Sequence, residues 1–346
     1  AINIAAEYNR MVTRSENMAY TKKRGRFPSS DKHHKCEYYI AVPKGKPLGI
    51  VQIVHGMNEY AERYSPFAEY LTERGYIVCA HDHLGHGRTA GPHSELGYFG
   101  SKHGWMYLIN DMVMFSRIIR KKYPELPLFL YGHSMGSLIV RAAMVKYGGV
   151  YDGVVVEGTV GFLNTLPALG MLAADAQSAV MGVDHHSEWM QHILNSAGNI
   201  GIKDKMSDHD WVSHDIRVIN EFTSEERMNF AFTSSAFSDL FMLVIYSSRR
   251  QWFYSADRSV PVLILGGTKD PVSSYGKAEL DLYKRMCKAG FRDVQLSIYE
   301  DARHEMLNDL NSAKVMEDTY LWIDRHRIAK DETDVCKSKQ YGAVRA

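Results

Sequence analysis

The sequence predicts an α/β fold in which a mainly parallel central sheet is flanked by helices and carries an inserted helical cap. Short apolar segments alternate with amphipathic ones, a pattern typical of a parallel sheet covered on both faces. A sharp, glycine-flanked turn, 132–136, joins one apolar segment to a helical one. A long segment with helical patterning, 161–259, separates two strand-like segments, and its length exceeds that of an ordinary loop.

Each element of this fold has a local signal. Continuous or alternating apolar residues indicate the strands, and apolar residues at helical spacing, closed by Gly or Pro, indicate the helices. The predicted strands are 36–42, 49–54, 76–80, 128–131, 154–156, 262–265 and 294–299. The predicted helices outside the cap are 60–74, 105–123, 137–147 and 312–328.

These elements divide the chain into a core, a cap and two terminal segments. We expect the core to consist of residues 31–160 and 260–330, with the cap, 161–259, inserted between them. Residues 1–30 are expected to form a surface extension, with a short helix followed by a basic loop at Lys22-Lys23-Arg24. The polar, aperiodic residues 331–346 are expected to form a mobile C-terminal tail.

Composition narrows the class of protein. The 41 Lys and Arg residues nearly balance the 40 Asp and Glu residues, and no basic stripe indicates a nucleic-acid partner. The sequence has no apolar run of membrane-spanning length and no signal-peptide pattern near its start. The four cysteines, Cys36, Cys79, Cys287 and Cys336, lack the close spacing of a zinc site or a small disulfide scaffold. We therefore expect reduced thiols and a cytoplasmic location.

Gly132-His133-Ser134-Met135-Gly136 is the strongest functional signal. It fits Gly-x-Ser-x-Gly and lies between a predicted strand and a predicted helix, which is the setting of a nucleophile elbow. Such a turn strains the backbone at the serine and lifts its hydroxyl above the edge of the sheet. Ser134 is therefore the predicted nucleophile.

A serine nucleophile needs a base, and the base needs an acid that orients it. In this arrangement the acid and then the histidine follow the serine along the chain, each after a late strand. Asp270 follows the predicted strand 262–265, and His304 follows the strand 294–299. Glu157, which also ends a strand, is the alternative acid.

The oxyanion of the transition state needs preorganised hydrogen-bond donors. One predicted donor is the backbone N–H of Met135, directly after the nucleophile. The other is the N–H of Met57, in the loop that follows the strand 49–54. No matching set of carboxylates follows the histidine-rich segment 81–87, and the pairs His33-His34 and His185-His186 are isolated, so we expect the segment to brace the active-site loops, with no metal and no cofactor.

Together these segments resemble the monoacylglycerol lipase and lysophospholipase group of the α/β-hydrolase superfamily. The resemblance covers roughly residues 35 to 325 and is weakest in the cap. It implies the α/β-hydrolase fold, Ser134, Asp270 and His304 as catalytic triad, and the Met57 and Met135 amides as oxyanion hole. The matching stretches are 55–64, 82–89, 132–136, 270–272 with 275–277, and 302–305.

The resemblance also implies substrate contacts. Members of the group use a Glu and an Arg near the glycerol hydroxyls, which correspond here to Glu59 and Arg63; an ion pair within the helix is the simpler alternative. Glu157 stands where the group has a small residue, so it is expected to make the pocket more polar. Apolar cap residues line an acyl tunnel in the group and can touch lipid surfaces. The cap candidates for such contacts are Leu163, Leu169 and Met181.

The expected function is hydrolysis of carboxylic esters of medium- to long-chain acyl groups, in the manner of a monoacylglycerol lipase or lysophospholipase. The expected partner is a small acyl ester, and the sequence leaves the oligomeric state open. A serine aminopeptidase or an aromatic-acid esterase could use the same triad. A third alternative, a hydrolase-fold binding protein without catalysis, is disfavoured because all three triad residues are present.

Overall fold

A single sheet organises the computed structural model, which describes residues 20–161, 165–203 and 205–342, with side chains up to residue 328. The described residues form eight strands in the order β1-β2-β4-β3-β5-β6-β7-β8. Strand β2 runs antiparallel to both of its neighbours, β1 and β4. The other six strands, β3 to β8, run parallel to one another. The strands are β1 (Tyr20–Pro28), β2 (Lys35–Pro43), β3 (Gly49–Val54), β4 (Tyr76–His81), β5 (Leu128–His133), β6 (Gly153–Glu157), β7 (Val262–Gly267) and β8 (Val294–Tyr299).

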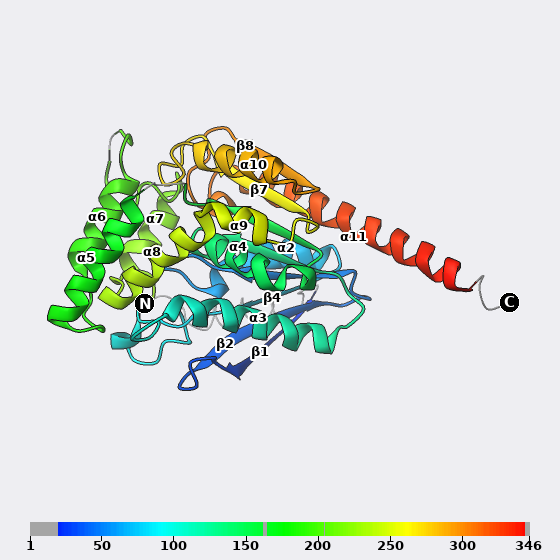
Figure 1. Ribbon diagram of the computed structural model, residues 1–346, viewed down its shortest axis with the longest axis horizontal. Coiled ribbons are helices and arrows are strands. Elements are labelled where there is room, and N and C mark those ends of the chain that lie inside the picture. The colour runs from blue at the N-terminus through cyan, green and yellow to red at the C-terminus, as the bar shows by residue number, and fades with distance from the viewer. Residues whose placement is uncertain (1–19, 162–164, 204, 343–346) are drawn as a thin grey trace, which may run out of the picture.

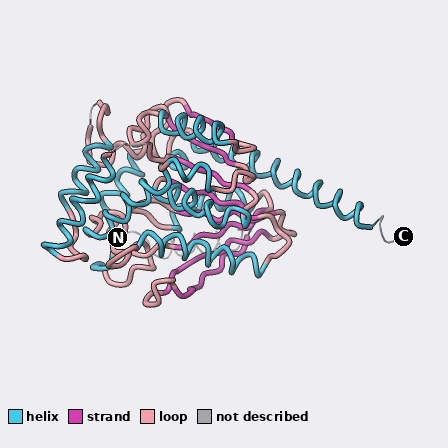
Figure 2. Tube along the Cα trace, viewed as in Figure 1, coloured by secondary structure: helices cyan, strands magenta, loops and turns pink. Residues whose placement is uncertain are grey.

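Helices cover both faces of this sheet (Figure 2). The α-helices are α2 (Ser65–Glu73), α3 (Gly104–Lys122), α4 (Met135–Tyr147), α5 (Leu166–Met181), α6 (Glu188–Gly198), α7 (Ile216–Ser224), α8 (Ser234–Ser248), α9 (Arg250–Ser255), α10 (Lys277–Ala289) and α11 (Ser312–Gly342). Short 3-10 turns occupy Ala61–Tyr64, His93–Glu95, Gly148–Val150 and Met306–Asn308.

Successive residues of the central strands point to opposite faces, and both faces are apolar. Val51 and Phe129 pack with the apolar residues of α2 and α11 on one face. Ile50 and Leu128 pack with those of α3, α4 and α10 on the other face. Strands β3 to β7 are buried along their whole length, which explains their continuous apolar sequences. The sequence prediction of a mainly parallel, doubly covered sheet is confirmed.

Helices α5 to α8 gather at one end of the sheet, α9 lies beside α4, and α11 projects from the opposite end (Figure 1). Helices α5 to α9 all lie between β6 and β7 in the sequence, as the long gap between two predicted strands indicated. In the described part of the chain, no helix combines the length and the apolar character needed to cross a bilayer.

Two terminal predictions differ from the structure. The predicted basic loop is strand β1, paired with β2 from Tyr20 to Pro28. Tyr20 and Phe27, near its two ends, are buried, whereas Lys23, Arg24 and Arg26 are exposed on this edge strand. The predicted tail is helix α11, which continues to Gly342. A helix that projects from the core needs no regular spacing of apolar residues. Because helices were predicted from that spacing, the end of α11 was not predicted. The short helix expected within residues 1–19 lies outside the described residues.

Candidate active site

Ser134 lies at the junction of β5 and α4 in a strained backbone conformation. Its φ angle is 51° and its ψ angle is −117°. L-residues rarely adopt such values, which cost on the order of 1–3 kcal/mol and persist only where the surroundings enforce them. The Ser134 N–H donates to the Glu157 carbonyl oxygen at 3.0 Å, at the end of the neighbouring strand β6. This is the geometry that the nucleophile elbow predicts.

The two glycines of the elbow are explained by close backbone packing. A Cβ atom on Gly136 would collide with the carbonyl oxygen of Val54, at the end of β3. A Cβ atom on Gly132 would lie 2.7 Å from the Gly136 carbonyl oxygen. Only glycine therefore lets the helix start this close to the strands, which keeps the turn at Ser134 sharp.

His304 and Asp270 lie in contact, in the loops that follow β8 and β7. The His304 Nδ1 atom is 2.9 Å from the Asp270 Oδ2 atom. Asp270 is completely buried, and its other carboxylate oxygen accepts the Val272 N–H at 2.9 Å. The His304 tautomer with its proton on Nδ1 satisfies this contact and leaves Nε2 unprotonated. His304 Nε2 is bonded to none of the described protein groups, so this atom is free to act as a base.

Ser134 and His304 line the same cavity, which has a volume of about 340 Å³. The cavity lies between the end of the sheet and the cap, and most of its lining is apolar. Its lining residues include Met57, Asn58, His133, Ser134, Met135, Leu138, Val160, Leu166, Leu194, His209, Trp211, Phe222, Leu240, Phe241, Val244, Pro271, Val272, His304 and Glu305. A cavity of this kind suits an apolar ligand whose polar group reaches Ser134.

The two predicted oxyanion donors both lie on this cavity. Met135 is the first residue of α4, so its N–H has no partner within the helix and lies at the positive end of the helix dipole. Met57 donates none of the hydrogen bonds found among the described residues. Gly56, beside Met57, passes so close to the nucleophile that a Cβ atom there would lie 3.1 Å from the Ser134 Cβ atom.

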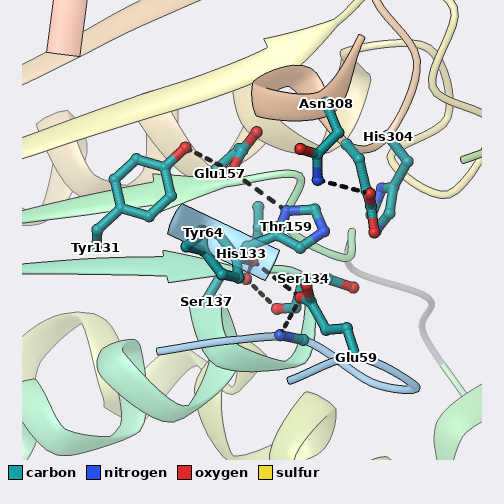
Figure 3. A network of polar contacts seen from close by, with 12 residues as sticks. Glu59, Tyr64, Tyr131, His133, Ser134, Ser137, Glu157, Thr159, His304 and Asn308 are labelled. Atoms are coloured by element: carbon teal, nitrogen blue, oxygen red, sulfur yellow. Dashed lines mark hydrogen bonds and ion pairs between the residues drawn. The ribbon is translucent and has the colours of Figure 1, made fainter. Parts of the chain in front are cut away.

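Glu157 lies behind the elbow, away from the cavity (Figure 3). Its Oε2 atom accepts the Tyr131 hydroxyl at 2.5 Å and lies 3.3 Å from the His133 Nδ1 atom. Burial lowers the pKa of His133, but the carboxylates of Glu157, Glu59 and Glu305 together outweigh burial and raise this pKa to about 9. Glu157 thus serves as the counter-charge of His133. The expectation that it would contact substrate is wrong, because its side chain is buried beneath the site, and it does not contact His304.

Glu59 and Arg63 also lie behind the site. Two Arg63 nitrogens donate to the two carboxylate oxygens of Glu305, at 2.7 and 2.8 Å, and one of them donates to Glu59 at 3.1 Å. Burial raises the pKa of Glu305, but the Arg63 guanidinium outweighs it and leaves this pKa lowered. Neither Glu59 nor Arg63 lines the cavity, so the expected head-group contact is not found. The ion pair expected as the alternative is present, but it is buried.

The same region contains the one group of potential metal ligands found among the described residues. The ligand atoms of Glu59, His133 and Glu305 lie within 4.8 Å of one another. However, Arg63 already binds both oxygens of Glu305 and contacts Glu59. The charges of these two carboxylates are therefore already paired with a guanidinium.

The cap places its predicted residues differently from the expectation. Leu169 and Met181 are 59% and 56% exposed on α5 and do not line the cavity, because they occupy the outer side of this helix. Leu163 lies outside the described residues. Two lining residues that sequence reasoning did not assign to the site, His133 and Trp211, lie against His304, with ring centroids 4.9 and 5.1 Å from that of His304. Trp211 stands in no motif or period, so no sequence signal indicated its role.

Comparisons with known proteins agree with this geometry. The family model described as serine aminopeptidase, S33 (Hydrolase_4) matches residues 45–311. A monoacylglycerol lipase of Mycolicibacterium smegmatis is 27% identical, with 84% of this chain and 92% of that protein covered. A monoglyceride lipase homolog of Monkeypox virus is 26% identical, with 83% and 93% covered. A thermostable carboxyl esterase from Bacillus coagulans, solved in complex with glycerol, has a TM-score of 0.83 at 25% identity, with 89% and 99% covered.

Proposed function

We propose that this chain, which belongs to the serine aminopeptidase S33 (Hydrolase_4) family of α/β-hydrolases, is a serine hydrolase of carboxylic esters. Its substrates are esters of medium- to long-chain acyl groups, monoacylglycerols included, and it acts through an acyl-enzyme intermediate. The observation that carries this proposal is the placement of Ser134 and His304 on one apolar cavity, with Asp270 directly behind His304. Relatives named monoacylglycerol and monoglyceride lipases support it.

In the proposed acylation step, the Ser134 oxygen attacks the ester carbonyl carbon while His304 Nε2 takes the hydroxyl proton. The electron pair of the carbonyl moves to its oxygen, which the N–H groups of Met57 and Met135 stabilise. Asp270 holds the imidazole in the correct tautomer and stabilises the imidazolium. When the carbonyl re-forms, the C–O bond to the alcohol breaks and His304 returns the proton to the leaving oxygen.

Deacylation repeats these steps with water. His304 takes a proton from a water molecule, and the water oxygen attacks the acyl carbon. The same two N–H groups stabilise the second oxyanion. Its collapse breaks the bond to Ser134, and the proton on His304 returns to the serine oxygen, so that the carboxylic acid is released and the enzyme is restored.

The cavity lining favours an acyl chain on one side and an uncharged head group on the other. Leu138, Leu240 and Val244 are apolar lining residues, and each methylene that they bury stabilises binding by roughly 0.8 kcal/mol. None of the described lining residues is Lys or Arg, and Glu305 is paired with Arg63. The cationic lining residue His133 is already paired with Glu157, so an anionic phosphate would find no unpaired counter-charge there, and a neutral polyol such as glycerol is the favoured head group.

We also propose transient contact between the cap and a lipid surface. Apolar side chains are exposed together along the outer side of the cap, where a monomeric protein would otherwise leave them in water. The five exposed residues on α5 and α6 that carry this proposal are Leu169, Leu172, Val180, Met181 and Trp189. Flotation of the protein with neutral vesicles tests it, and unchanged flotation of a Leu172→Ser, Val180→Ser double variant would contradict it.

A cytoplasmic location completes the proposal. The cysteines whose side chains the structure describes, Cys36, Cys79 and Cys287, are all free thiols, which suits a reducing compartment. Fractionation of cells that express the tagged protein tests this.

Turnover of matched substrates tests the activity. We expect the purified full chain to hydrolyse p-nitrophenyl esters and monoacylglycerols, and to act far more weakly on lysophosphatidylcholine and aminoacyl amides. A fluorophosphonate should label wild type but not Ser134→Ala. Faster turnover of the amides would favour the aminopeptidase alternative. Neither labelling nor turnover would indicate a non-catalytic binding protein.

A further inference from the structure

A short cap segment, Asp210–His214, lies against the loop that carries the candidate catalytic histidine. This segment connects α6 with α7, whereas the loop, Arg303–Asp309, follows β8. Their backbones are hydrogen-bonded at the histidine itself. The Glu305 N–H donates to the Val212 carbonyl oxygen at 2.8 Å, and the His304 N–H donates to the Trp211 carbonyl oxygen at 3.4 Å.

Arg303, directly before the histidine, strengthens this contact. Its Nη1 atom donates to two carbonyl oxygens of the cap segment, that of Asp210 at 2.5 Å and that of Ser213 at 2.8 Å. A single guanidinium nitrogen therefore joins both ends of the cap segment to the backbone beside His304. Because the guanidinium is planar and always charged, these bonds are directional and insensitive to pH.

Asp309 joins the two segments from the other side. Its Oδ2 atom accepts the backbone N–H of Arg303 at 2.7 Å, and its Oδ1 atom accepts the backbone N–H of His214 at 2.9 Å. The Ser213 hydroxyl lies 3.3 Å from the same Oδ1 atom and donates to the Asn308 carbonyl oxygen at 2.9 Å. Asp309 is 5% exposed, so these bonds are shielded from water.

We propose that this contact makes the cap a positioning element for His304, with Arg303 and Asp309 as the positioning residues. Neither residue touches the reacting atoms. They fix the backbone on both sides of His304 relative to Trp211, whose ring packs on the imidazole, while Asp270 holds its Nδ1 atom. The position of the cap segment and the orientation of the His304 imidazole toward the cavity are thereby coupled. This inference rests on the triad proposed above.

The size of the effect follows from the precision that proton transfer requires. A displacement of about 1 Å in a catalytic group costs on the order of 10²-fold in rate. A purely structural role would instead lower the melting temperature and the fraction of active protein, and would leave the turnover of each active molecule unchanged. Measurement of kcat per active site therefore separates the two roles.

The experiment compares Arg303→Met and Asp309→Asn with Arg217→Met, an exposed arginine of the cap whose ion pair, within the described part of the chain, is with Asp215. Active sites are titrated with a fluorophosphonate, and kcat and KM are measured on p-nitrophenyl acetate, a substrate too short to depend on the acyl cavity. We expect kcat per titrated site to fall by roughly 10- to 100-fold in both test variants, with KM within about twofold. Arg303→Lys should recover part of the loss, and Arg217→Met should behave as wild type.

Unchanged kcat per titrated site in Arg303→Met and Asp309→Asn would overturn the proposal, whatever happens to their melting temperatures. If both variants fail to fold, Ser213→Ala decides, because it removes the hydroxyl bonds to Asn308 and Asp309 and, within the cap, the bond that the hydroxyl accepts from the Asp215 N–H. Wild-type kcat per site in Ser213→Ala would then overturn the proposal. Failure of wild type itself to react with the fluorophosphonate would instead overturn the proposed triad, so the two failures are distinguishable.

Discussion

The positive φ angle at Ser134 is maintained by the packing of neighbouring backbones. The Ser134 N–H donates to the Glu157 carbonyl oxygen in β6, and Gly136 lies directly against the end of β3. These two contacts hold the backbone of Ser134 in this conformation. A residue in such a conformation is strained unless its surroundings leave it no alternative. The proposed nucleophile is therefore positioned before substrate arrives, and such preorganisation limits the reorganisation that a reaction requires.

The assignment of the acid can be tested with two carboxyl-to-amide changes. We expect Asp270→Asn to lower kcat by roughly 10⁴-fold, because Asn favours the wrong His304 tautomer and cannot stabilise the imidazolium. Glu157→Gln should lower kcat less than about tenfold and mainly reduce stability, because Glu157 contacts Tyr131 and His133 instead. Active-site titration and thermal melting measure both effects. A larger loss of kcat in Glu157→Gln would reassign the acid.

Arg63 provides a second test, on stability. Arg63→Met would leave the carboxylates of Glu59 and Glu305 buried without their counter-charge. Breaking a buried ion pair from one side costs about 3–5 kcal/mol, whereas an exposed pair contributes about 1 kcal/mol or less. Chemical denaturation should therefore show a large loss in Arg63→Met and little change in Arg217→Met. Equal losses of unfolding free energy in the two variants would mean that the ion pairs of Arg63 contribute no more to stability than an exposed pair does.

Sequence reasoning located Asp270 and His304 because each follows a strand, and parallel strands bring such positions to one edge of a sheet. It could not predict which residues surround Glu59. Glu59 and Arg63 are four residues apart in the sequence and look like an ordinary helical pair. Their burial depends on Glu305, 242 residues beyond Arg63, and no local pattern encodes a contact of that range.

At the scale of elements, the sequence does not show which apolar side chains of the cap helices line the cavity and which are exposed. Helix α8 places Leu240 and Val244 on the cavity, whereas α5 exposes Leu169 to solvent. Both helices are rich in apolar residues, so periodicity alone cannot tell which face lines a tunnel. The three-dimensional arrangement is needed to choose the residues that determine acyl length.

A matched pair of substitutions tests this choice. We expect Leu240→Phe to shorten the preferred acyl chain, because the larger ring fills part of the cavity, and to leave p-nitrophenyl acetate turnover nearly unchanged. Leu169→Phe, at an exposed position, should leave the chain-length profile as it is in wild type. Catalytic efficiencies across an ester series measure both profiles. Identical profiles in wild type and Leu240→Phe would exclude this cavity as the acyl site.

The two elements that sequence reasoning missed share a cause. Strand β1 and the outer part of α11 are rich in polar residues; β1 lies at the edge of the sheet, and α11 projects from the body of the molecule (Figure 1). Hydrophobic periodicity reports burial on one face, so it is weak wherever an element lies at an edge or leaves the body. Strand β1 is specified by its pairing with β2, which is a tertiary contact.

On the scale of the whole molecule, four buried histidines make stability depend on pH. His55, His81, His83 and His86 pack ring against ring beside the early strands, with centroids as close as 4.1 Å for His55 and His83. Burial lowers the pKa of all four, that of His81 to about 3 and that of His86 to about 4. The folded protein therefore keeps these rings neutral at pH 7.

An unfolded chain would protonate these histidines near pH 6.5, well above their folded pKa values. Between pH 6.5 and about 3–4 the unfolded state thus binds more protons, so stability is complete above pH 6.5 and is lost as the pH falls. Each histidine contributes a slope of up to about 1.4 kcal/mol per pH unit in this range. His133, whose pKa is raised to about 9, acts oppositely, and its contribution is lost from pH 6.5 to 9.

His81 allows this account to be tested directly. Neither of its ring nitrogens has a hydrogen-bond partner among the described residues, and its ring packs against Phe27 and Phe115. His81→Phe should therefore lose no hydrogen bond and should cost little stability at pH 8. Below pH 6.5 its unfolding free energy should fall less steeply than that of wild type, by about 1.4 kcal/mol per pH unit. His33→Phe, an exposed control, should keep the wild-type slope, and the same slope in His81→Phe would show that the acid sensitivity arises elsewhere.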